Sequence, residues 1–314
     1  MCNLILNNKL IKTYIPDKWP IFMSEYITEI IPKKLSITTK MIEDDECFLG
    51  NEKYEISIMN WMTLVEMFIQ TATLMIKNLP ENKFKTIVIS RLSDVSFFHE
   101  VRPKDVLRIE TFMKKYKNNI LQGYGIIYSS NKIIFKSKFF LASKSDDQKS
   151  FYDNNERFFK SRKVLFGYDY IRKFLKNIFP FLFIDYIESI KHENFITAIK
   201  NVSSNEWFFP NHFPNDPIMP GIFLVESILQ TTTFLINMQL NKNFFPYLVK
   251  LYKIAFYSYV RPGDVLQIDV EIEKYKHSLI RAKGSIFIQD KIICKAEYLL
   301  CIKEQMLINK DMVI

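Results

Sequence analysis

The chain contains two copies of one sequence pattern. The segment VRPGDVLQIDVEIEKYK at 260–276 matches VRPKDVLRIETFMKKYK at 101–117, an offset of 159 residues. GIFLVESILQTTTFLI at 221–236 overlays WMTLVEMFIQTATLMI at 61–76 at an offset of 160. Because the two offsets differ by one residue, the repeat covers most of each half with one small gap. A chain of two homologous halves folds into two copies of one domain, and this constrains the architecture more than any other feature.

The domain boundaries follow from the repeat and from composition. The 314 residues suffice for two domains of ordinary size, and a hydrophobic content of 48% supplies two buried cores. Between the halves lies a stretch rich in Asp, Asn, Ser and Lys, which is typical of a linker. We predict an N-terminal domain at 1–142, a linker at 143–163 and a C-terminal domain at 164–314.

Composition excludes several classes of protein. The formal net charge of +9 favours an acidic partner, but the chain has no Lys/Arg run of the kind that binds nucleic acid, so we expect no nucleic-acid partner. The four cysteines show neither CxxC spacing nor companion histidines, which predicts free thiols and no metal site. No window reaches about 18 uninterrupted apolar residues, and the N-terminus lacks a signal-peptide pattern. We therefore expect a cytoplasmic protein with no membrane span.

Each half has the same predicted order of elements. Residues 221–238 form an apolar run that is too long for a typical strand, follows a Pro-Gly pair and has no internal breaker, so we predict a buried central helix. Short turns, such as SSNK at 129–132 in the first half and QDK at 289–291 in the second, separate several strands that follow the long apolar segment of each half. The fold class is α+β, with two repeats that each wrap an antiparallel sheet around one long helix.

One segment of the second repeat carries a specific motif. NEWFFPNHFPNDPIMPGIFLVESILQ at 205–230 resembles the signature of the β-hydroxyacyl-acyl carrier protein dehydratases of type II fatty acid synthesis (FabZ-like). That family has His-Phe-Pro, then Pro-Ile/Val-Met-Pro-Gly, then a helix with an acid five residues past the glycine. The matching residues here are His212, Phe213, Pro214, Pro217, Ile218, Met219, Pro220, Gly221 and Glu226, with Gln230 one helical turn later. The resemblance covers about residues 167–303 and implies a double hot-dog fold.

The resemblance also implies an activity. A hydro-lyase of this kind removes water from a (3R)-hydroxyacyl thioester, carried on the phosphopantetheine arm of an acyl carrier protein, and uses no metal or nucleotide cofactor. The elimination needs a base, an acid and a donor that stabilises enolate charge. His212 suits the base, because an imidazole exchanges protons near neutral pH. A Glu in an apolar helix suits the acid, because burial raises its pKa, and Gly221 opens the helix with a free backbone N–H.

The fused repeat determines which acid meets the histidine. In the resembled family the histidine of one subunit works with the acid of its partner, so the two repeats should form an internal pseudo-dimer. Glu66 aligns with Glu226, and Gln70 aligns with Gln230. We therefore predict one working site made of His212, Gly221 and Glu66, with Glu226, Gln70 and Gln230 as secondary candidates.

The reciprocal site has lost the motif. Glu52 stands where the second repeat has His212, and Trp61 stands where it has Gly221. Tyr54 and Asn60 likewise replace two of the motif's prolines. Without the histidine this site has no base, and an indole at the helix start would block a thioester. The repeated VRP-x-D element occurs in both halves, which favours a structural turn over a catalytic role.

Several alternatives remain open at this point. The same reading admits a dehydratase that also isomerises the double bond, although related isomerising enzymes carry Asp at the acid position. A hot-dog thioesterase is a further hypothesis, since one fold hosts several reactions. From another class, the chain could be a non-catalytic acyl-binding subunit of a synthase. The sequence leaves open the chain length, the choice between fatty acid and polyketide-like pathways, and any further homo-oligomer.

Overall fold

The computed structural model describes residues 4–6, 27–31, 34–42, 61–77, 86–143, 163–175, 181–244, 246–276 and 278–302. Apart from its end residues Ser143 and Lys163, the predicted linker at 143–163 lies outside these ranges. Ser143 is the last residue of a strand. Glu52, Tyr54 and Asn60, the first-repeat residues that replace motif residues, also lie outside the described residues.

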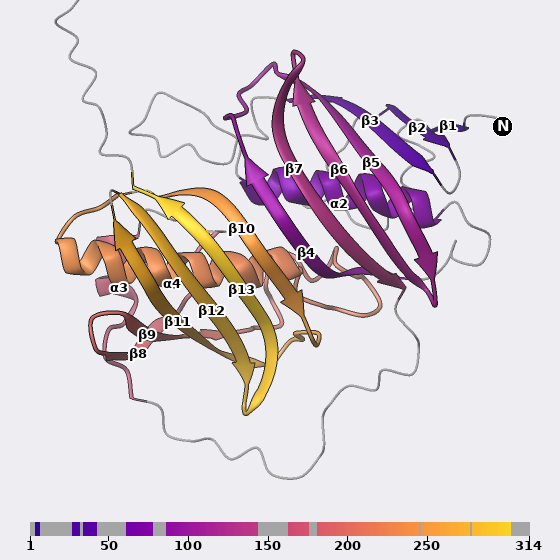
Figure 1. The fold of residues 1–314 in the computed structure, drawn as a ribbon. Coiled ribbons are helices and arrows are strands. Elements are labelled where there is room, and N and C mark those ends of the chain that lie inside the picture. The colour runs from indigo at the N-terminus through magenta and orange to yellow at the C-terminus, as the bar shows by residue number, and fades with distance from the viewer. Residues whose placement is uncertain are drawn as a thin grey trace, which may run out of the picture.

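From β2 in the first half and β8 in the second, the two halves contain matching series of elements (Figure 1). The first half comprises β1 (Leu4–Leu6), β2 (Ile27–Ile31), β3 (Leu35–Met41), α2 (Trp61–Lys77), β4 (Ile87–Phe97), β5 (Val106–Lys117), β6 (Ile120–Ser129) and β7 (Lys132–Ser143). The second comprises α3 (Tyr168–Phe174), β8 (Tyr186–Lys191), β9 (Phe195–Asn201), α4 (Gly221–Leu240), β10 (Tyr247–Phe256), β11 (Val265–Lys276), β12 (Leu279–Ile288) and β13 (Lys291–Cys301). Each half thus has one long helix and a set of strands in the same order, which is the predicted double hot-dog arrangement.

All described strands belong to one 13-stranded sheet with the order β1-β2-β3-β5-β6-β7-β4-β10-β13-β12-β11-β9-β8. From the centre outwards, β4-β7-β6-β5-β3-β2 in the first half mirrors β10-β13-β12-β11-β9-β8 in the second. The antiparallel pair β4 and β10 joins the halves, with Arg91 opposite Ala255 and Ser96 opposite Lys250. The two repeats therefore share a continuous sheet, as the subunits of a dimer would.

The central helices pack closely against the sheet because one strand in each half carries a glycine beneath them. A Cβ atom added at Gly284 on β12 would lie 2.2 Å from Cγ2 of Ile228 on α4. At Gly125 on β6, the same atom would lie 2.7 Å from Cε2 of Phe68 on α2. These glycines occupy matching positions in the repeat, and each lets a bulky helix residue rest directly on the strand backbone.

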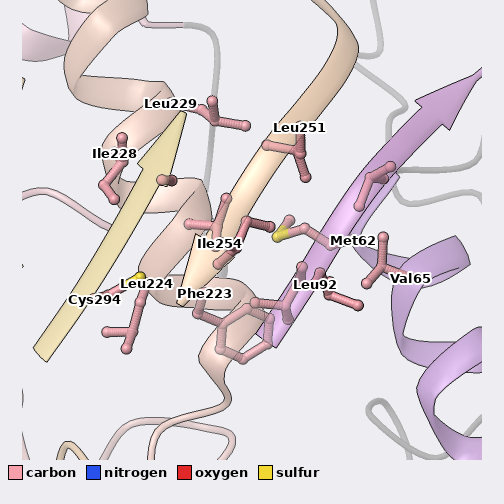
Figure 2. Packing of buried hydrophobic residues seen from close by; sticks show 14 of the residues in the cluster. Met62, Val65, Leu92, Phe223, Leu224, Ile228, Leu229, Leu251, Ile254 and Cys294 are labelled. Carbon is pink, nitrogen blue, oxygen red and sulfur yellow. The ribbon is translucent and has the colours of Figure 1, made fainter. Parts of the chain in front are cut away.

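The hydrophobic core runs without interruption across the junction of the halves. Figure 2 shows Leu251 and Ile254 of β10 and Leu92 of β4 lying between the side chains of α4 and those of α2. All three are fully buried, as is Val65 on α2. Shared packing of this kind restricts the relative movement of the two helices, because interiors are close-packed.

The helix α4 extends two residues beyond the predicted 221–238. It ends where Asn241 adopts a left-handed conformation at φ 50° and its N–H donates to the carbonyls of Asn237 and Met238. By length and apolarity α4 could cross a bilayer, but 83% of its most apolar window is buried. It is the central core helix of the second half.

Candidate active site

Four of the six site residues predicted from sequence line one cavity between the repeats, and Glu226 and Gln230 are not among its lining residues. This cavity has a volume of about 230 Å³, and its lining includes His212 and Gly221 from the second half together with Glu66 from the first. Further wall residues are Ile69, Ile87, Met219 and Leu224. A mostly apolar cavity with a few convergent polar groups is the usual form of a small-molecule site.

A tight loop before α4 holds His212. The N–H of His212 donates to the carbonyl of Phe208 at 2.9 Å, and the N–H of Ile218 donates back to the carbonyl of His212 at 2.9 Å. The imidazole stacks on the ring of Phe213 with 4.1 Å between centroids. Backbone and side chain of His212 are thus both fixed by residues of the motif.

The protonation of His212 follows from its surroundings. Its Nδ1 lies 2.7 Å from the carbonyl oxygen of Ile218. Because a carbonyl can only accept, Nδ1 carries the proton and Nε2 keeps its lone pair. Burial lowers the pKa of His212 to about 4, against the opposing effect of the hydrogen bond to Ile218. At neutral pH the ring is therefore an uncharged base.

Gly221 is the first residue of α4, directly after the cap residue Pro220. The first N–H groups of a helix have no acceptor within the helix, and the helix dipole makes this end attractive to an oxygen that carries negative charge. A Cβ atom at Gly221 would lie 3.0 Å from Cε1 of Phe256, which also lines the cavity. A larger residue here would therefore crowd the cavity wall.

Glu66 contributes the carboxyl group from the other repeat. It lies on α2, partly buried, and its Oε1 accepts a hydrogen bond of 3.0 Å from Nε2 of Gln70. Burial raises the pKa of Glu66 to about 7, although the Gln70 hydrogen bond opposes this shift. A carboxyl with this pKa is substantially protonated at neutral pH, so it can donate a proton.

The reciprocal position is occupied by an indole. Nε1 of Trp61 donates a hydrogen bond of 3.0 Å to Oε2 of Glu226. The other oxygen of Glu226 accepts from Nε2 of Gln230 at 2.8 Å. Gln230 is itself anchored, since its Oε1 accepts from the N–H of Phe183 and its Nε2 donates to the carbonyl of Phe181. Both carboxylate oxygens of Glu226 thus accept hydrogen bonds from protein side chains.

The VRP-x-D element forms the same turn in both repeats. The N–H of Arg102 donates to Asp105 at 2.9 Å, and the N–H of Arg261 donates to Asp264 at 2.7 Å. The prediction of a structural turn is therefore confirmed. In the second repeat the guanidinium of Arg261 also contacts the histidine loop, with Nη1 at 2.6 Å from Oδ1 of Asp216.

Sequence reasoning missed three contributors to the site. The carbonyl of Ile218 sets the tautomer of His212, Arg261 braces the loop, and residues 256–260 form one wall of the cavity. Ile218 and Arg261 both lie in motifs that were recognised. Their roles depend on which carbonyl and which carboxylate lie within reach, and the motifs carry no such information.

Comparison with solved structures agrees with this architecture. The dehydratase domain of RzxB from Pseudomonas fluorescens matches with a TM-score of 0.58 at 10% identity, over 92% of this chain and all of that one. The dehydratase domain of the CurJ module of curacin polyketide synthase gives 0.56 at 13% identity, over 90% and 98%. A putative oleoyl thioesterase from Lactobacillus plantarum gives 0.56 at 11%, over 86% and 97%. The class that these matches define is the double hot-dog protein.

Sequence comparison identifies the family. The FabA-like domain model matches residues 176–297. The 3-hydroxyacyl-[acyl-carrier-protein] dehydratase FabZ of Petrotoga mobilis is 39% identical over 134 residues, which are 43% of this chain and 96% of that protein. The FabZ of Oceanobacillus iheyensis is 35% identical over 134 residues, with 42% and 96% covered. The chain belongs to the FabZ family of dehydratases.

Proposed function

We propose that the protein dehydrates (3R)-3-hydroxyacyl thioesters to trans-2-enoyl thioesters, with the acyl chain carried on the phosphopantetheine arm of an acyl carrier protein. The observation that supports this most directly is the composition of the cavity. His212 and Gly221 of one repeat and Glu66 of the other line the same space. These are the base, the oxyanion donor and the acid that the elimination needs.

In the proposed reaction His212 removes the α-proton through Nε2. The electron pair of the broken C–H bond forms the new double bond between the α- and β-carbons. Glu66 gives its proton to the β-hydroxyl, and the C–O bond breaks to release water. The backbone N–H of Gly221 donates to the thioester oxygen, where negative charge builds up as the α-proton leaves. The products are the enoyl thioester, water, a protonated His212 and an ionised Glu66.

The resting protonation states suit these roles. Burial holds the pKa of His212 near 4 and lifts that of Glu66 to about 7. Between these values the histidine is neutral and the glutamic acid is protonated. The free protein therefore has the pair in the form that starts the dehydration, and one proton transfer back from His212 to Glu66 restores it.

The proposal gives the protein one working site in each chain. The second repeat's own acid, Glu226, accepts a hydrogen bond from the indole of Trp61. We assign Gln70 and Gln230 the role of holding the carboxyl groups, since each donates to the Glu one helical turn before it. Every step uses groups of the protein, so the reaction requires no metal and no nucleotide cofactor.

The proposal extends to partners and setting. A net charge of +9 suits an acidic carrier protein, because opposite charges speed and orient docking. The repeats act as an internal pseudo-dimer, and a cytoplasmic enzyme of fatty acid or polyketide-like synthesis is the setting that we propose. The described cysteines, Cys294 and Cys301, are free thiols, which suits a reducing compartment.

Hydration of crotonyl thioesters, the reverse reaction, tests the proposal. The purified chain should consume the enoyl absorbance, and His212→Ala should abolish this activity, while the exposed His99→Ala keeps it. Loss of the enoyl signal with release of free thiol would assign thioester hydrolysis instead. Absence of turnover with crotonyl and longer enoyl thioesters on carrier protein, despite measurable binding, would assign an acyl-binding subunit and overturn the proposal.

A further inference from the structure

The reciprocal site, whose histidine is replaced in the sequence, contains a contact that joins the two central helices. Trp61 opens α2 and Glu226 lies on α4, and the hydrogen bond between them measures 3.0 Å. These residues are 165 positions apart, so the contact crosses from one repeat to the other. It lies across the pseudo-symmetry axis from the cavity that holds Gly221 and Glu66.

The spacing of the four residues links the contact to the cavity. Trp61 precedes Glu66 by five positions on α2, and Gly221 precedes Glu226 by five positions on α4. With a rise of 1.5 Å per residue, each pair is separated by about 7.5 Å along its helix. A bond between Trp61 and Glu226 thus joins the first two turns of α2 to those of α4, and these turns carry Glu66 and Gly221.

The acceptor in this contact is held from two sides, whereas the hydrogen bond of Glu66 within the described residues comes from its own helix. Glu226 is 6% exposed and is also held by Gln230, which reaches the backbone of Phe181 and Phe183. The indole of Trp61 packs edge-on against Phe97 at 6.4 Å. Glu66 accepts from Gln70, a residue of its own helix, so that bond sets its rotamer but not the place of α2.

We propose that Trp61 and Glu226 are positioning residues. Their hydrogen bond across the repeats sets the distance between Glu66 and the thioester held at Gly221, and this inference rests on the proposed function. The acid of the inactive site is thereby retained for the geometry of the active one. Neither residue touches the substrate. Small displacements of a catalytic group lower the rate of a reaction steeply, which makes such a brace functionally important.

The test is a double-mutant cycle in crotonyl-thioester hydration. Trp61→Phe keeps an aromatic ring and removes the N–H donor, and Glu226→Leu removes the acceptor. We expect each single variant to lower kcat about tenfold with KM nearly unchanged. The double variant should be no slower than the singles, because both remove the same bond. Glu226→Gln retains an amide oxygen that can accept from Trp61, so it should restore most of the activity lost in Glu226→Leu.

Two further readouts separate positioning from stability. The limb of the kcat–pH profile that belongs to Glu66 should move in Trp61→Phe, because the carboxyl changes its surroundings, while the unfolding temperature changes little. Thr71→Val is the matched control, since it removes a buried hydrogen bond of 2.9 Å to Met67 within α2 and should leave kcat and the pH profile unchanged. If the wild-type protein is active, either of two results would overturn the inference. Both single variants could keep the wild-type kcat and pH profile, or the double variant could show the sum of the two single losses. An inactive wild type would instead count against the proposed function.

Discussion

The guanidinium of Arg261 lies 2.6 Å from the carboxylate of Asp216 and 3.4 Å from the carbonyl of Pro217. Asp216 in turn exchanges backbone hydrogen bonds with Phe213, the residue after His212. The turn after β10 therefore braces the loop that carries the base. Arg102 occupies the matching place in the first repeat, with its side chain 61% exposed and 3.8 Å from Glu100.

This brace predicts unequal effects of two equivalent substitutions. Arg261→Ala should lower kcat for crotonyl-thioester hydration about tenfold, because the histidine loop loses its side-chain anchor. Arg102→Ala should leave kcat within about twofold, since exposed ion pairs contribute little. Steady-state kinetics of both variants checks this. Equal losses in the two would mean that the turn itself, and not the contact with Asp216, determines the activity.

The pH dependence of kcat/KM should be bell-shaped. Activity requires one proton on the pair of His212 and Glu66, in either direction of the reaction. The rate should rise as pH increases through about 4, where His212 loses its extra proton, and fall as pH increases through about 7, where Glu66 ionises. Hydration rates measured at low substrate from about pH 3 to 9 report these limbs. An optimum above pH 8 would contradict the assignment of Glu66 as the acid.

Glu66 should also make the fold less stable at alkaline pH. Its pKa is about 7 in the folded protein and 4.5 without burial, so the folded state holds the proton more tightly. The stability contributed by this proton is fully present below pH 4.5 and is lost as pH rises through 7. Glu66→Gln should therefore raise the free energy of unfolding at pH 8. We expect about 1 to 2 kcal/mol, which is less than the full pKa shift would give, because the side chain of Glu66 is only partly buried.

Urea unfolding at pH 5 and pH 8 measures this difference. The gain of Glu66→Gln over wild type should be present at pH 8 and nearly absent at pH 5. Glu297→Gln, on the exposed outer face of β13, should show no such dependence. If Glu66→Gln is as stable as the wild type at both pH values, the carboxyl group of Glu66 is not desolvated in the folded protein.

Close approach of helix to strand predicts the effect of filling a glycine. In Gly284→Ala the new methyl group would start 2.2 Å from Ile228, so strand and helix must separate. We expect a loss of about 1 to 3 kcal/mol in the free energy of unfolding. Gly167→Ala is the control, because a Cβ there meets nothing within 4 Å, and its effect should stay below about 1 kcal/mol, the scale of a substitution at the N-cap of α3. Similar effects of both substitutions would contradict the packing described for α4.

The sequence was sufficient to predict the repeat, the central helices and the double hot-dog class. The repeat and the apolar pattern of the helices can be detected in the order of the residues alone, without knowledge of three-dimensional contacts. The helix 221–240 was predicted two residues short because Asn241, not a glycine or proline, provides its left-handed end. The shared cavity of His212 and Glu66 was predicted only through a family resemblance that pairs the two repeats.

Contacts between distant positions were not predictable. Arg102 and Arg261 occupy the same motif, yet Arg261 pairs with Asp216 of the histidine loop, whereas Arg102 lies 3.8 Å from Glu100. The indole of Trp61 was expected to block a thioester, but its hydrogen bond to Glu226 depends on how two helices cross. Such pairings are set by the three-dimensional path of the chain and leave no periodic signal in the sequence.

The most direct measurement of the account compares kcat for crotonyl-thioester hydration in His212→Ala, Glu66→Gln and Glu226→Gln. If the site joins an imidazole of the second repeat to a carboxyl of the first, the first two variants should lose at least about a hundredfold in kcat, the usual scale for a general acid or base. Glu226→Gln should stay within about threefold of wild type, since it keeps an acceptor for Trp61. If Glu226→Gln loses most of its kcat while Glu66→Gln keeps the wild-type kcat, the account is contradicted. His212 would then work with the carboxyl group of its own repeat.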